Sequence, residues 1–225
     1  MTLLLGDHLK VFLWGAGMHR FEPLRGTTTV GVVCSDGVIL ATDTRATMGT
    51  YVASKRAKKV YKITDRLAMT VAGGVAVAQR VVEILRANAR LFELENGRPM
   101  PVSAAARLVS NLLFSNREEG MPLPLQALVA GFDESGPHIY SLDPFGSVTE
   151  ERVVSTGSGS PIAYGVLEDQ YREGRTVDEM LPIVVRAVDS AMKRDVASGD
   201  SFDVAVITKE GFRELTAEEK RALLS

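Results

Sequence analysis

Short apolar runs separated by turn residues dominate the chain from residue 27 onward. The first two runs, 27–33 and 38–43, flank an Asp-Gly turn at 35–37, which is typical of a β-hairpin. Further strands are predicted at 60–64, 67–73, 125–133, 138–143, 147–157 and 202–208. The pattern therefore predicts a protein rich in short strands.

The hydrophobic period changes to that of a helix in several places. One run begins near Val77 and ends before Gly97 and Pro99, which stop helices, and a second begins after Ser103. Further helices are predicted at 160–171, 177–193 and, as a short terminal element, 216–224. Because strands are grouped apart from paired helices, we expect an α+β fold with sheets inside and helices outside.

The composition narrows the function classes. The chain has 225 residues, 45% of them hydrophobic, which fits one globular domain, and its net charge of −2 gives no reason to expect nucleic acid or a membrane as partner. The single cysteine, Cys34, excludes an internal disulfide and suits a reducing cytoplasm. His8, His19 and His138 are scattered and no nucleotide-binding motif is present, so we expect no metal and no cofactor.

The first 26 residues differ from the rest. Their apolar stretch is interrupted by Asp7, His8 and Lys10, and it lacks the charged start and unbroken core of a signal peptide. Met18 offers a second possible start. The apolar runs of the chain are too short to span a bilayer.

The segment RGTTTVG at 25–31 raises a specific hypothesis. Threonine is β-branched, so three threonines opening a strand are unremarkable in isolation. However, Gly26 directly precedes Thr27, where a small residue lets a neighbouring hydroxyl approach its carbonyl. The strand that follows the first hairpin turn ends at Asp43.

Here the sequence resembles the catalytic β subunits of the archaeal proteasome. The matching segments, in the family's order, are RGTTTVG, LATDTRATMG, ASKRAKKVYKI, MTVAGG, STGSGSPIAYGVLE and SAMKRDVASGD. The resemblance implies an N-terminal nucleophile hydrolase with a four-layer αββα sandwich of two antiparallel sheets between helical layers. It also implies that residues 1–26 are a propeptide removed by self-cleavage between Gly26 and Thr27, leaving 27–225 as the catalytic domain.

The implied chemistry needs an activated threonine. A hydroxyl is a weak nucleophile, and an α-amino group with a pKa of about 7.7–8.0 can serve as its base once Thr27 is the first residue. Lys59 matches the family's lysine, whose ammonium would keep that amine neutral, and Asp43 matches the carboxylate that holds the lysine. Without the resemblance, Lys59 would read as one solvated cation in a lysine-rich segment.

A second cluster is implied around the amine of the nucleophile: Ser158, Asp195 and Ser198. Read without the family, TGSGS is a flexible turn and RDVASGD is a helix end with Gly199 as its stop. Val196 replaces a serine that is common in relatives, at a position outside the implied catalytic set.

The resemblance also implies how substrate is held. Gly73 would donate its N–H to the oxyanion, and Thr47, Gly73 and Val75 would pair with an extended substrate through main-chain bonds. The pocket would be lined by Ala46, Ala57, Tyr61, Val71 and Val75. These are mostly small or apolar side chains, so we expect a preference for hydrophobic residues. Val77 replaces an acidic residue of many relatives, which affects the pocket's details.

Three other interpretations of the sequence are a different hydrolase, an inactive subunit and a bacterial relative. A serine or cysteine hydrolase lacks a base, because only His138 remains after cleavage at Gly26, and Cys34 reads as a small packing residue. An unprocessed or inactive β subunit could act as ring scaffold beside a second β subunit, but the intact catalytic set argues against this. The bacterial hexameric relative shares the nucleophile, yet GSGSPIAYGVLE is closer to the archaeal heptameric type.

The implied partners follow from the same resemblance. They are proteasome α subunits and other β subunits, stacked as heptameric rings in the order α7β7β7α7, with an ATP-dependent unfoldase that delivers unfolded polypeptide. The expected location is the cytoplasm.

Overall fold

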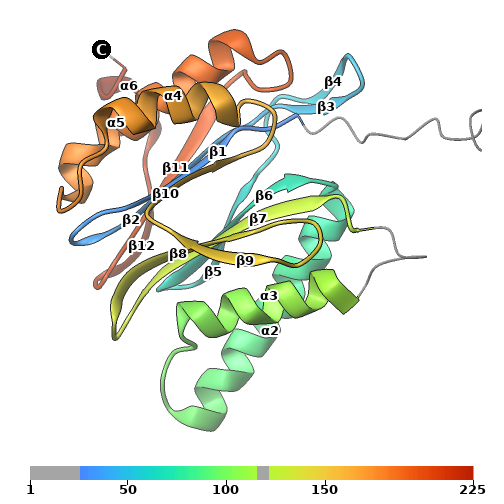
Figure 1. Ribbon diagram of the computed structural model, residues 1–225, viewed down its shortest axis with the longest axis vertical. Coiled ribbons are helices and arrows are strands. Elements are labelled where there is room, and N and C mark those ends of the chain that lie inside the picture. Colours follow the sequence, from blue (N-terminus) through green and yellow to red (C-terminus); the bar gives the residue numbers. More distant parts are fainter. Residues whose placement is uncertain (1–25, 116–121, 225) are drawn as a thin grey trace, which may run out of the picture.

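Two antiparallel sheets face each other in the computed structural model, and helices cover the outer face of each sheet (Figure 1). The structure describes residues 26–115 and 122–224, so nearly all of the expected propeptide lies outside the described residues. The layers follow the order helices, sheet, sheet, helices. The predicted α+β fold class and its αββα layering are therefore confirmed.

The first sheet has five strands in the order β10-β1-β2-β11-β12. Its strands are β1 (Thr29–Val33), β2 (Gly37–Asp43), β10 (Val153–Thr156), β11 (Phe202–Thr208) and β12 (Gly211–Glu214). β1 and β2 form the predicted hairpin, with Val33 opposite Val38. Gly31 packs closely against the second sheet, since a Cβ there would stand 3.0 Å from Ile139 Cδ1.

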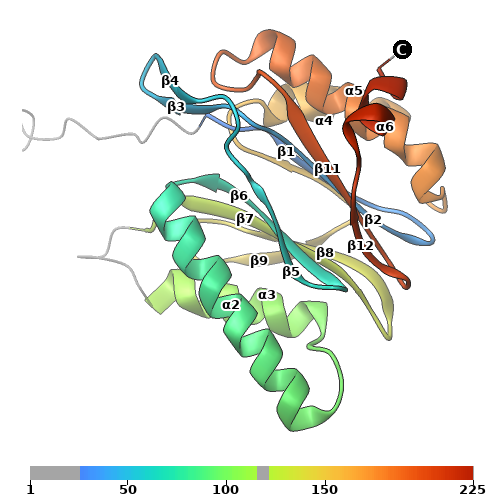
Figure 2. The same cartoon turned by 180° about the vertical axis from the view of Figure 1, so that it is seen from behind.

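The second sheet also has five strands, in sequence order. They are β5 (Val60–Thr64), β6 (Leu67–Gly73), β7 (Leu125–Asp133), β8 (Gly136–Leu142) and β9 (Val148–Glu151). A separate two-stranded hairpin, β3 (Ala46–Met48) and β4 (Tyr51–Ser54), extends from the end of the molecule where β1 begins (Figure 2).

Each sheet has its own helical layer. The first sheet is covered by α4 (Ser160–Gln170) and α5 (Val177–Arg194), and the second by α2 (Val75–Asn96) and α3 (Val102–Ser115). The short α6 (Ala217–Ala222) ends the described chain. The predicted helix stop at Gly97 is confirmed: Gly97 caps the C-terminus of α2 in the left-handed conformation, with φ of 66°.

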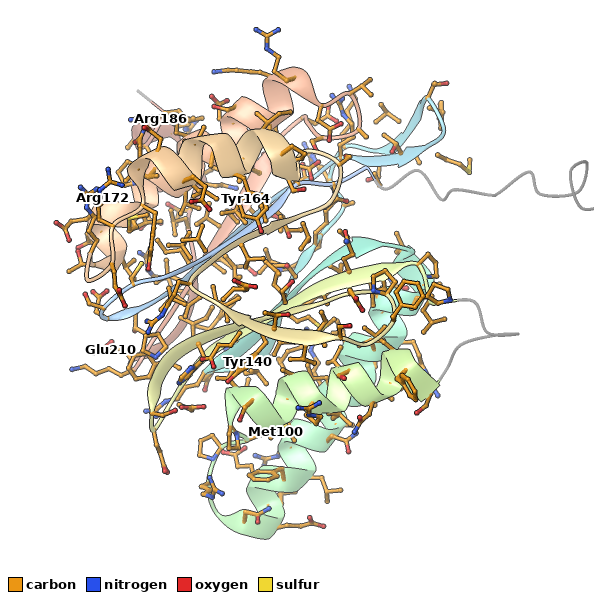
Figure 3. All side chains as sticks on the ribbon, viewed as in Figure 1. Met100, Tyr140, Tyr164, Arg172, Arg186 and Glu210 are labelled. Carbon is orange, nitrogen blue, oxygen red and sulfur yellow. The ribbon has the colours of Figure 1, made fainter. Side chains whose placement is uncertain are left out.

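Buried apolar side chains form one cluster between each helical layer and its sheet, and a third between the two sheets. α5 contributes the most regular stripe, which includes Val184, Val185 and Val188. Side chains fill the space between the layers, and Arg172 and Arg186 lie on the outer surface of the α4–α5 layer (Figure 3). The two sheets are thereby fixed relative to each other, which matters because the candidate site draws on both.

Two parts of the sequence-based reading need correction. The segment 147–157, predicted as one strand, is two strands in different sheets: β9 pairs with β8, and β10 pairs with β1. Only Arg152 separates them, and no glycine or proline marks the crossing, so the pattern contained no break. The short strands β3, β4 and β12 were not predicted at all.

Among the residues that the structure describes, no helix is long and apolar enough to cross a membrane. Nor do three or more His, Cys, Asp or Glu side chains gather there in a way that could hold a metal ion.

Candidate active site

The ends of several strands meet at one edge of the two sheets. Neighbouring antiparallel strands start and finish side by side, so the start of β1 lies beside the ends of β2 and β10, and β11 starts beside the end of β2. In the second sheet the start of β5 lies beside the middle of β6, three residues before Gly73. The residues carried there are Thr27, Asp43, Lys59, Gly73, Ser158, Asp195 and Ser198.

Asp43 is the buried centre of this edge. Its exposed fraction is 0%, and its two oxygens accept four hydrogen bonds. Oδ1 accepts from Lys59 Nζ at 2.7 Å and from the Thr28 N–H at 2.9 Å. Oδ2 accepts from the Arg45 N–H at 2.9 Å and the Gly199 N–H at 3.1 Å. A carboxylate held by this many donors has a fixed orientation.

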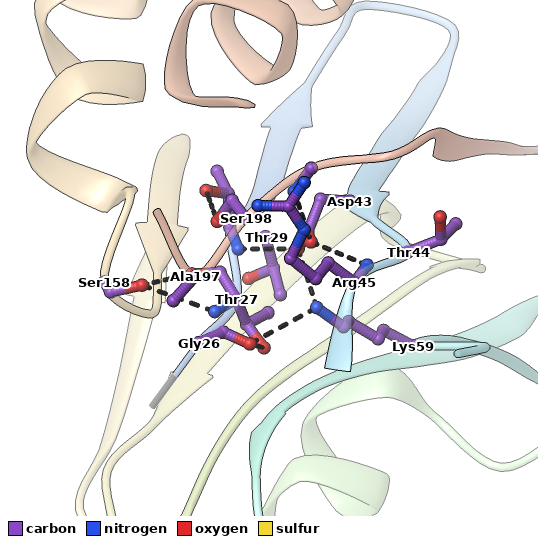
Figure 4. Close-up of polar contacts among 12 residues, drawn as sticks. Gly26, Thr27, Thr29, Asp43, Thr44, Arg45, Lys59, Ser158, Ala197 and Ser198 are labelled. Carbon is purple, nitrogen blue, oxygen red and sulfur yellow. Dashed lines mark hydrogen bonds and ion pairs between the residues drawn. The ribbon is translucent and has the colours of Figure 1, made fainter. Parts of the chain in front are cut away.

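Lys59 is 6% exposed, unlike the solvated lysines that surround it in the sequence. Burial lowers the pKa of its ammonium below the ordinary lysine value, because charge is unfavourable away from water, while Asp43 opposes that shift. Besides Asp43, the ammonium reaches the Gly26 carbonyl oxygen at 3.4 Å. Lys59 thus joins the buried carboxylate to the carbonyl that precedes Thr27 (Figure 4).

Thr27 lies against the carbonyl of its own preceding residue. Its hydroxyl donates a hydrogen bond to the Gly26 oxygen, and its backbone nitrogen lies 3.4 Å from Ser158 Oγ. Space around Gly26 is tight: a Cβ there would stand 2.3 Å from Thr47 Oγ1 and 2.7 Å from Ala197 Cβ. Only glycine fits between these two walls.

Ser158, Asp195 and Ser198 form one hydrogen-bonded group. Asp195 Oδ2 accepts from Ser158 Oγ at 2.5 Å and from Ser198 Oγ at 2.6 Å. Ser198 Oγ also lies 2.7 Å from Thr28 Oγ1. The group therefore runs from a carboxylate through Ser158 to the backbone nitrogen of Thr27, on the side of Thr27 away from Lys59 (Figure 4).

The TGSGS turn is closely packed rather than merely flexible. A Cβ on Gly157 would stand 2.1 Å from the Thr27 carbonyl oxygen, and one on Gly159 would stand 1.9 Å from Thr28 Oγ1. The Gly159 N–H also donates to the Thr27 carbonyl at 3.3 Å. Both glycines let the turn approach the backbone of Thr27 and the side chain of Thr28.

The reading of Gly199 as a helix stop is wrong. α5 ends at Arg194 with Asp195 as its cap, four residues before Gly199. Gly199 is required for another reason: a Cβ there would stand 2.5 Å from Arg45 Nη2, and its N–H reaches Asp43.

A cavity of about 330 Å³ opens beside Thr27. All the residues expected to hold substrate line it: Ala46, Thr47, Ala57, Tyr61, Gly73, Val71 and Val75. Tyr61 directs its hydroxyl to the Lys58 carbonyl at 2.9 Å, which leaves the ring face for apolar contact. The same cavity includes Lys58, Ala78 and Gln79, which the sequence reading did not single out.

Gly73 occupies the rim of this cavity at the end of β6. Its φ of 132° is in the region that disfavours other residues, and a Cβ there would stand 2.0 Å from the Pro124 oxygen. The backbone therefore needs glycine at this position.

The other nucleophile and base considered from the sequence lie elsewhere. Cys34 is packed in the core under α5, and burial raises the pKa of its thiol to about 12, so it is inert at neutral pH. His138 on β8 contacts Ser135 Oγ at 2.8 Å and Glu150 at 2.7 Å. The Ser135 hydroxyl, however, also lies 2.6 Å from Asp133 Oδ1, its better acceptor, so the group reads as a clamp on the β7–β8 hairpin.

Sequence reasoning missed two contributors. Thr28 connects the two halves of the site, since its N–H reaches Asp43 and its hydroxyl reaches Ser198. Arg45 binds the turn that carries Asp195 and Ser198. The only signal for Arg45 was its place in the LATDTRATMG segment.

The stretch of chain that carries these residues also matches known proteins. The sequence model of the family described as "Proteasome: Proteasome subunit" matches residues 24–207. The chain is 53% identical to "Proteasome subunit beta" of Methanosarcina barkeri over 207 residues, covering 92% of this chain and 97% of that one. It is 52% identical to the Methanosarcina mazei protein of the same name over 92% of this chain and 100% of that protein. The Ferroglobus placidus protein of that name is 53% identical over 92% and 98%.

Proposed function

We propose that this chain, which belongs to the proteasome subunit family, is the precursor of a threonine-type endopeptidase whose nucleophile is Thr27. Residues 1–26 are a propeptide that the chain removes by cutting the Gly26–Thr27 bond. Residues 27–225 then form the catalytic domain. The archaeal relatives named above support a β-subunit role.

One observation carries the proposal. The Thr27 hydroxyl and the Lys59 ammonium both contact the Gly26 carbonyl oxygen, and Lys59 is held by the buried Asp43. The bond to be cut, the nucleophile beside it and a cation able to polarise its carbonyl are thus within reach of one another. A strand threonine without catalytic work would need none of these neighbours.

Self-cleavage follows from this arrangement. Thr27 Oγ attacks the Gly26 carbonyl carbon, its proton passes to the departing nitrogen, and the C–N bond breaks to leave an ester. Water then hydrolyses the ester, which restores the hydroxyl and releases residues 1–26. Lys59 stabilises the negative charge that develops on the Gly26 oxygen.

In the mature enzyme the freed amine of Thr27 is the general base. It accepts the Oγ proton while Oγ attacks the substrate carbonyl, and later delivers a proton to the leaving amine. The Lys59 ammonium keeps the amine neutral at working pH, while Ser158, Asp195 and Ser198 hold it in place. The Gly73 N–H supplies the oxyanion donor. Water hydrolyses the acyl-enzyme.

Substrate is an extended, unfolded polypeptide that pairs with the backbone at Thr47, Gly73 and Val75. The apolar lining of the 330 Å³ cavity favours a hydrophobic residue before the cut. The subunit works in a cytoplasmic particle, in heptameric β rings between α rings, and an ATP-dependent unfoldase delivers the substrate.

Intact mass spectrometry tests the processing step. The chain is produced with and without α and β partner subunits, and the mass expected after assembly corresponds to a start at Thr27. A full-length chain inside assembled, active particles would contradict the proposal and favour a scaffold role beside a second β subunit.

Two variants of the nucleophile test the chemistry. Thr27→Ala removes the hydroxyl and should abolish both self-cleavage and hydrolysis of a fluorogenic peptide. Thr27→Ser keeps the hydroxyl and should retain both. Peptidase activity in assembled Thr27→Ala particles that contain no other β subunit would overturn the assignment.

A further inference from the structure

The turn between α5 and β11 carries two residues of the candidate site and is held from outside by Arg45. Arg45 Nε donates to Asp200 Oδ2 at 2.8 Å, and Arg45 Nη1 donates to the Val196 carbonyl at 2.8 Å. The planar guanidinium thereby bridges the two ends of the turn. Asp195, which accepts hydrogen bonds from both Ser158 and Ser198, lies in the same turn, as does Ser198.

The backbone of this turn requires such a restraint. Asp200 has φ of 65°, and no other described non-glycine residue has a positive φ. The left-handed region is unfavourable for residues with a Cβ, although Asp and Asn tolerate it better than most. Gly199 next to it has φ of 157° and packs against the guanidinium of Arg45. The ion pair between Arg45 and Asp200 therefore forms at a residue whose backbone conformation is unfavourable.

Arg45 is also joined to the catalytic carboxylate. Its backbone N–H donates to Asp43 Oδ2, the same oxygen that accepts from the Gly199 N–H. Asp43 Oδ2 therefore connects the Arg45 backbone to the 195–200 turn, and the Arg45 guanidinium binds the same turn. Neither Arg45 nor Asp200 lines the substrate cavity.

We infer that Arg45 and Asp200 are positioning residues: their ion pair fixes the 195–200 turn so that Asp195 and Ser198 hold Ser158 against the Thr27 nitrogen. This inference rests on the proposed function, because the group being positioned is the catalytic amine. It assigns a kinetic role to a pair that otherwise resembles a surface salt bridge.

A positioning role predicts a change in the pH profile that a general loss of stability does not predict. The charged groups around the Thr27 nitrogen are Lys59, Asp43 and Arg45 on one side and Asp195 on the other, and Asp200 is the counter-ion of Arg45. If the turn loosens, the Asp195 carboxylate moves away and the ammonium form of Thr27 loses a stabilising neighbour. The amine pKa then falls, and the acid limb of the rate profile moves to lower pH. Turnover drops while substrate affinity is kept.

Asp200→Gly and Asp200→Asn test this in assembled particles. Glycine accepts the left-handed backbone but removes the carboxylate, so a loss in this variant is due to the ion pair and not to the backbone conformation. We expect kcat to fall about 10-fold, because small misplacements of catalytic groups have effects of this order, with KM within about twofold. Asparagine keeps an oxygen acceptor for Arg45 and should restore part of kcat.

Two further variants complete the test. Asp200→Gly also removes a negative charge near the amine, which by itself lowers the amine pKa. Arg45→Lys keeps both charges of the pair, but one ammonium cannot bind both Val196 and Asp200, so a shift of the acid limb to lower pH in this variant reports the loosened turn. If Asp200→Gly fails to assemble, kcat and the acid limb are measured in Arg45→Lys instead. Arg213→Gln removes an exposed ion pair with Glu219, which joins β12 to α6, and should match wild type.

The outcomes are distinct. Wild-type kcat and an unshifted acid limb in Asp200→Gly, with Thr27→Ala inactive, would overturn the positioning role and leave the proposed function standing. A raised KM with an unchanged pH profile would likewise overturn it. Activity in Thr27→Ala would overturn the proposed function and this inference together.

Discussion

Lys59 Nζ donates to Asp43 Oδ1 across 2.7 Å, and both side chains are shielded from water. Lys58, the next residue back, makes an ion pair of the same length with Glu214 but at the surface. Two adjacent lysines therefore form equal bonds in opposite environments. Burial, not bond length, separates a candidate catalytic pair from a surface pair.

Replacing Asp43 with Asn should be severe. It leaves the buried Lys59 ammonium without its counter-charge and places an NH₂ group where Oδ2 accepts from two backbone N–H groups. Breaking a buried pair costs about 3–5 kcal/mol of unfolding free energy. Peptidase kcat/KM should fall by about 10²-fold or more, as expected for loss of acid–base chemistry. Denaturant unfolding and fluorogenic-peptide kinetics measure the two effects.

Glu214→Gln is the matched control. It removes the carboxylate from the 2.7 Å pair with Lys58, which is exposed and screened by solvent. We expect an effect below about 1 kcal/mol on the unfolding free energy and, because Lys58 lines the cavity but lies outside the proposed catalytic set, a wild-type kcat. Equal losses in the two variants would show that burial does not distinguish the pairs.

Replacing Gly26 with Ala should slow self-cleavage. The added Cβ would stand 2.3 Å from Thr47 Oγ1 and 2.9 Å from the Ala197 carbonyl oxygen, so the Gly26 carbonyl must move away from the Thr27 hydroxyl. The fraction of precursor, followed over time by intact mass, should stay high. The double variant with Thr47→Ala removes the closest contact and should recover part of the rate.

Gly165→Ala provides the comparison, because a Cβ there meets nothing within 4 Å. Alanine is favoured over glycine within a helix by about 1 kcal/mol, so α4 should be unharmed. Processing at the wild-type rate is expected in this variant. Wild-type processing in Gly26→Ala as well would refute the steric argument.

Filling the cavity should change substrate preference. Ala57 lines the cavity, and a phenylalanine there occupies part of its 330 Å³. For peptides with a large apolar residue before the cut, kcat/KM should fall about 10-fold or more, since a few methylene groups are worth about 1–3 kcal/mol in such pockets. Peptides with alanine there should be affected far less. Equal losses for both peptides would place the specificity pocket elsewhere.

The fold was predictable where residue patterns are local. The β1–β2 hairpin is marked by its Asp-Gly turn, and α2 by its period and Gly97. The crossing between β9 and β10 was not, because a strand can leave one sheet for another without a change in alternation. That exchange depends on which partner strand is nearest in space, which local sequence does not encode.

The site was predictable only as a set of residue types. The resemblance named Asp43 and Lys59, and the structure places them in contact, although their roles stay predictions. Arg45 escaped notice because its partners, Val196 and Asp200, lie more than 150 positions away in the chain. Long-range hydrogen bonds of this kind appear only once the chain is folded.

The titration of Lys59 gives the final prediction. Burial holds the pKa of its ammonium below the ordinary value of 10.5, so the charge is lost at lower pH than for a solvated lysine. Activity, which needs the charged form, should therefore fall on an alkaline limb below pH 10.5. Burial raises the pKa of the nearby Tyr61 phenol above its ordinary value of 10.0, so a limb below pH 10.0 is not due to ionisation of Tyr61.

Stability should change in the opposite direction over the same window. Between the folded pKa of Lys59 and 10.5, the unfolded chain binds more protons than the folded chain, so the contribution of this group to unfolding free energy rises with pH. Lys62→Met, at an exposed lysine paired with Asp65, should leave the alkaline limb where it is. Lys59→Met should abolish activity and remove this residue's part of the stability rise. An alkaline limb at or above 10.5 in the wild-type particle would show that Lys59 is not the titrating group.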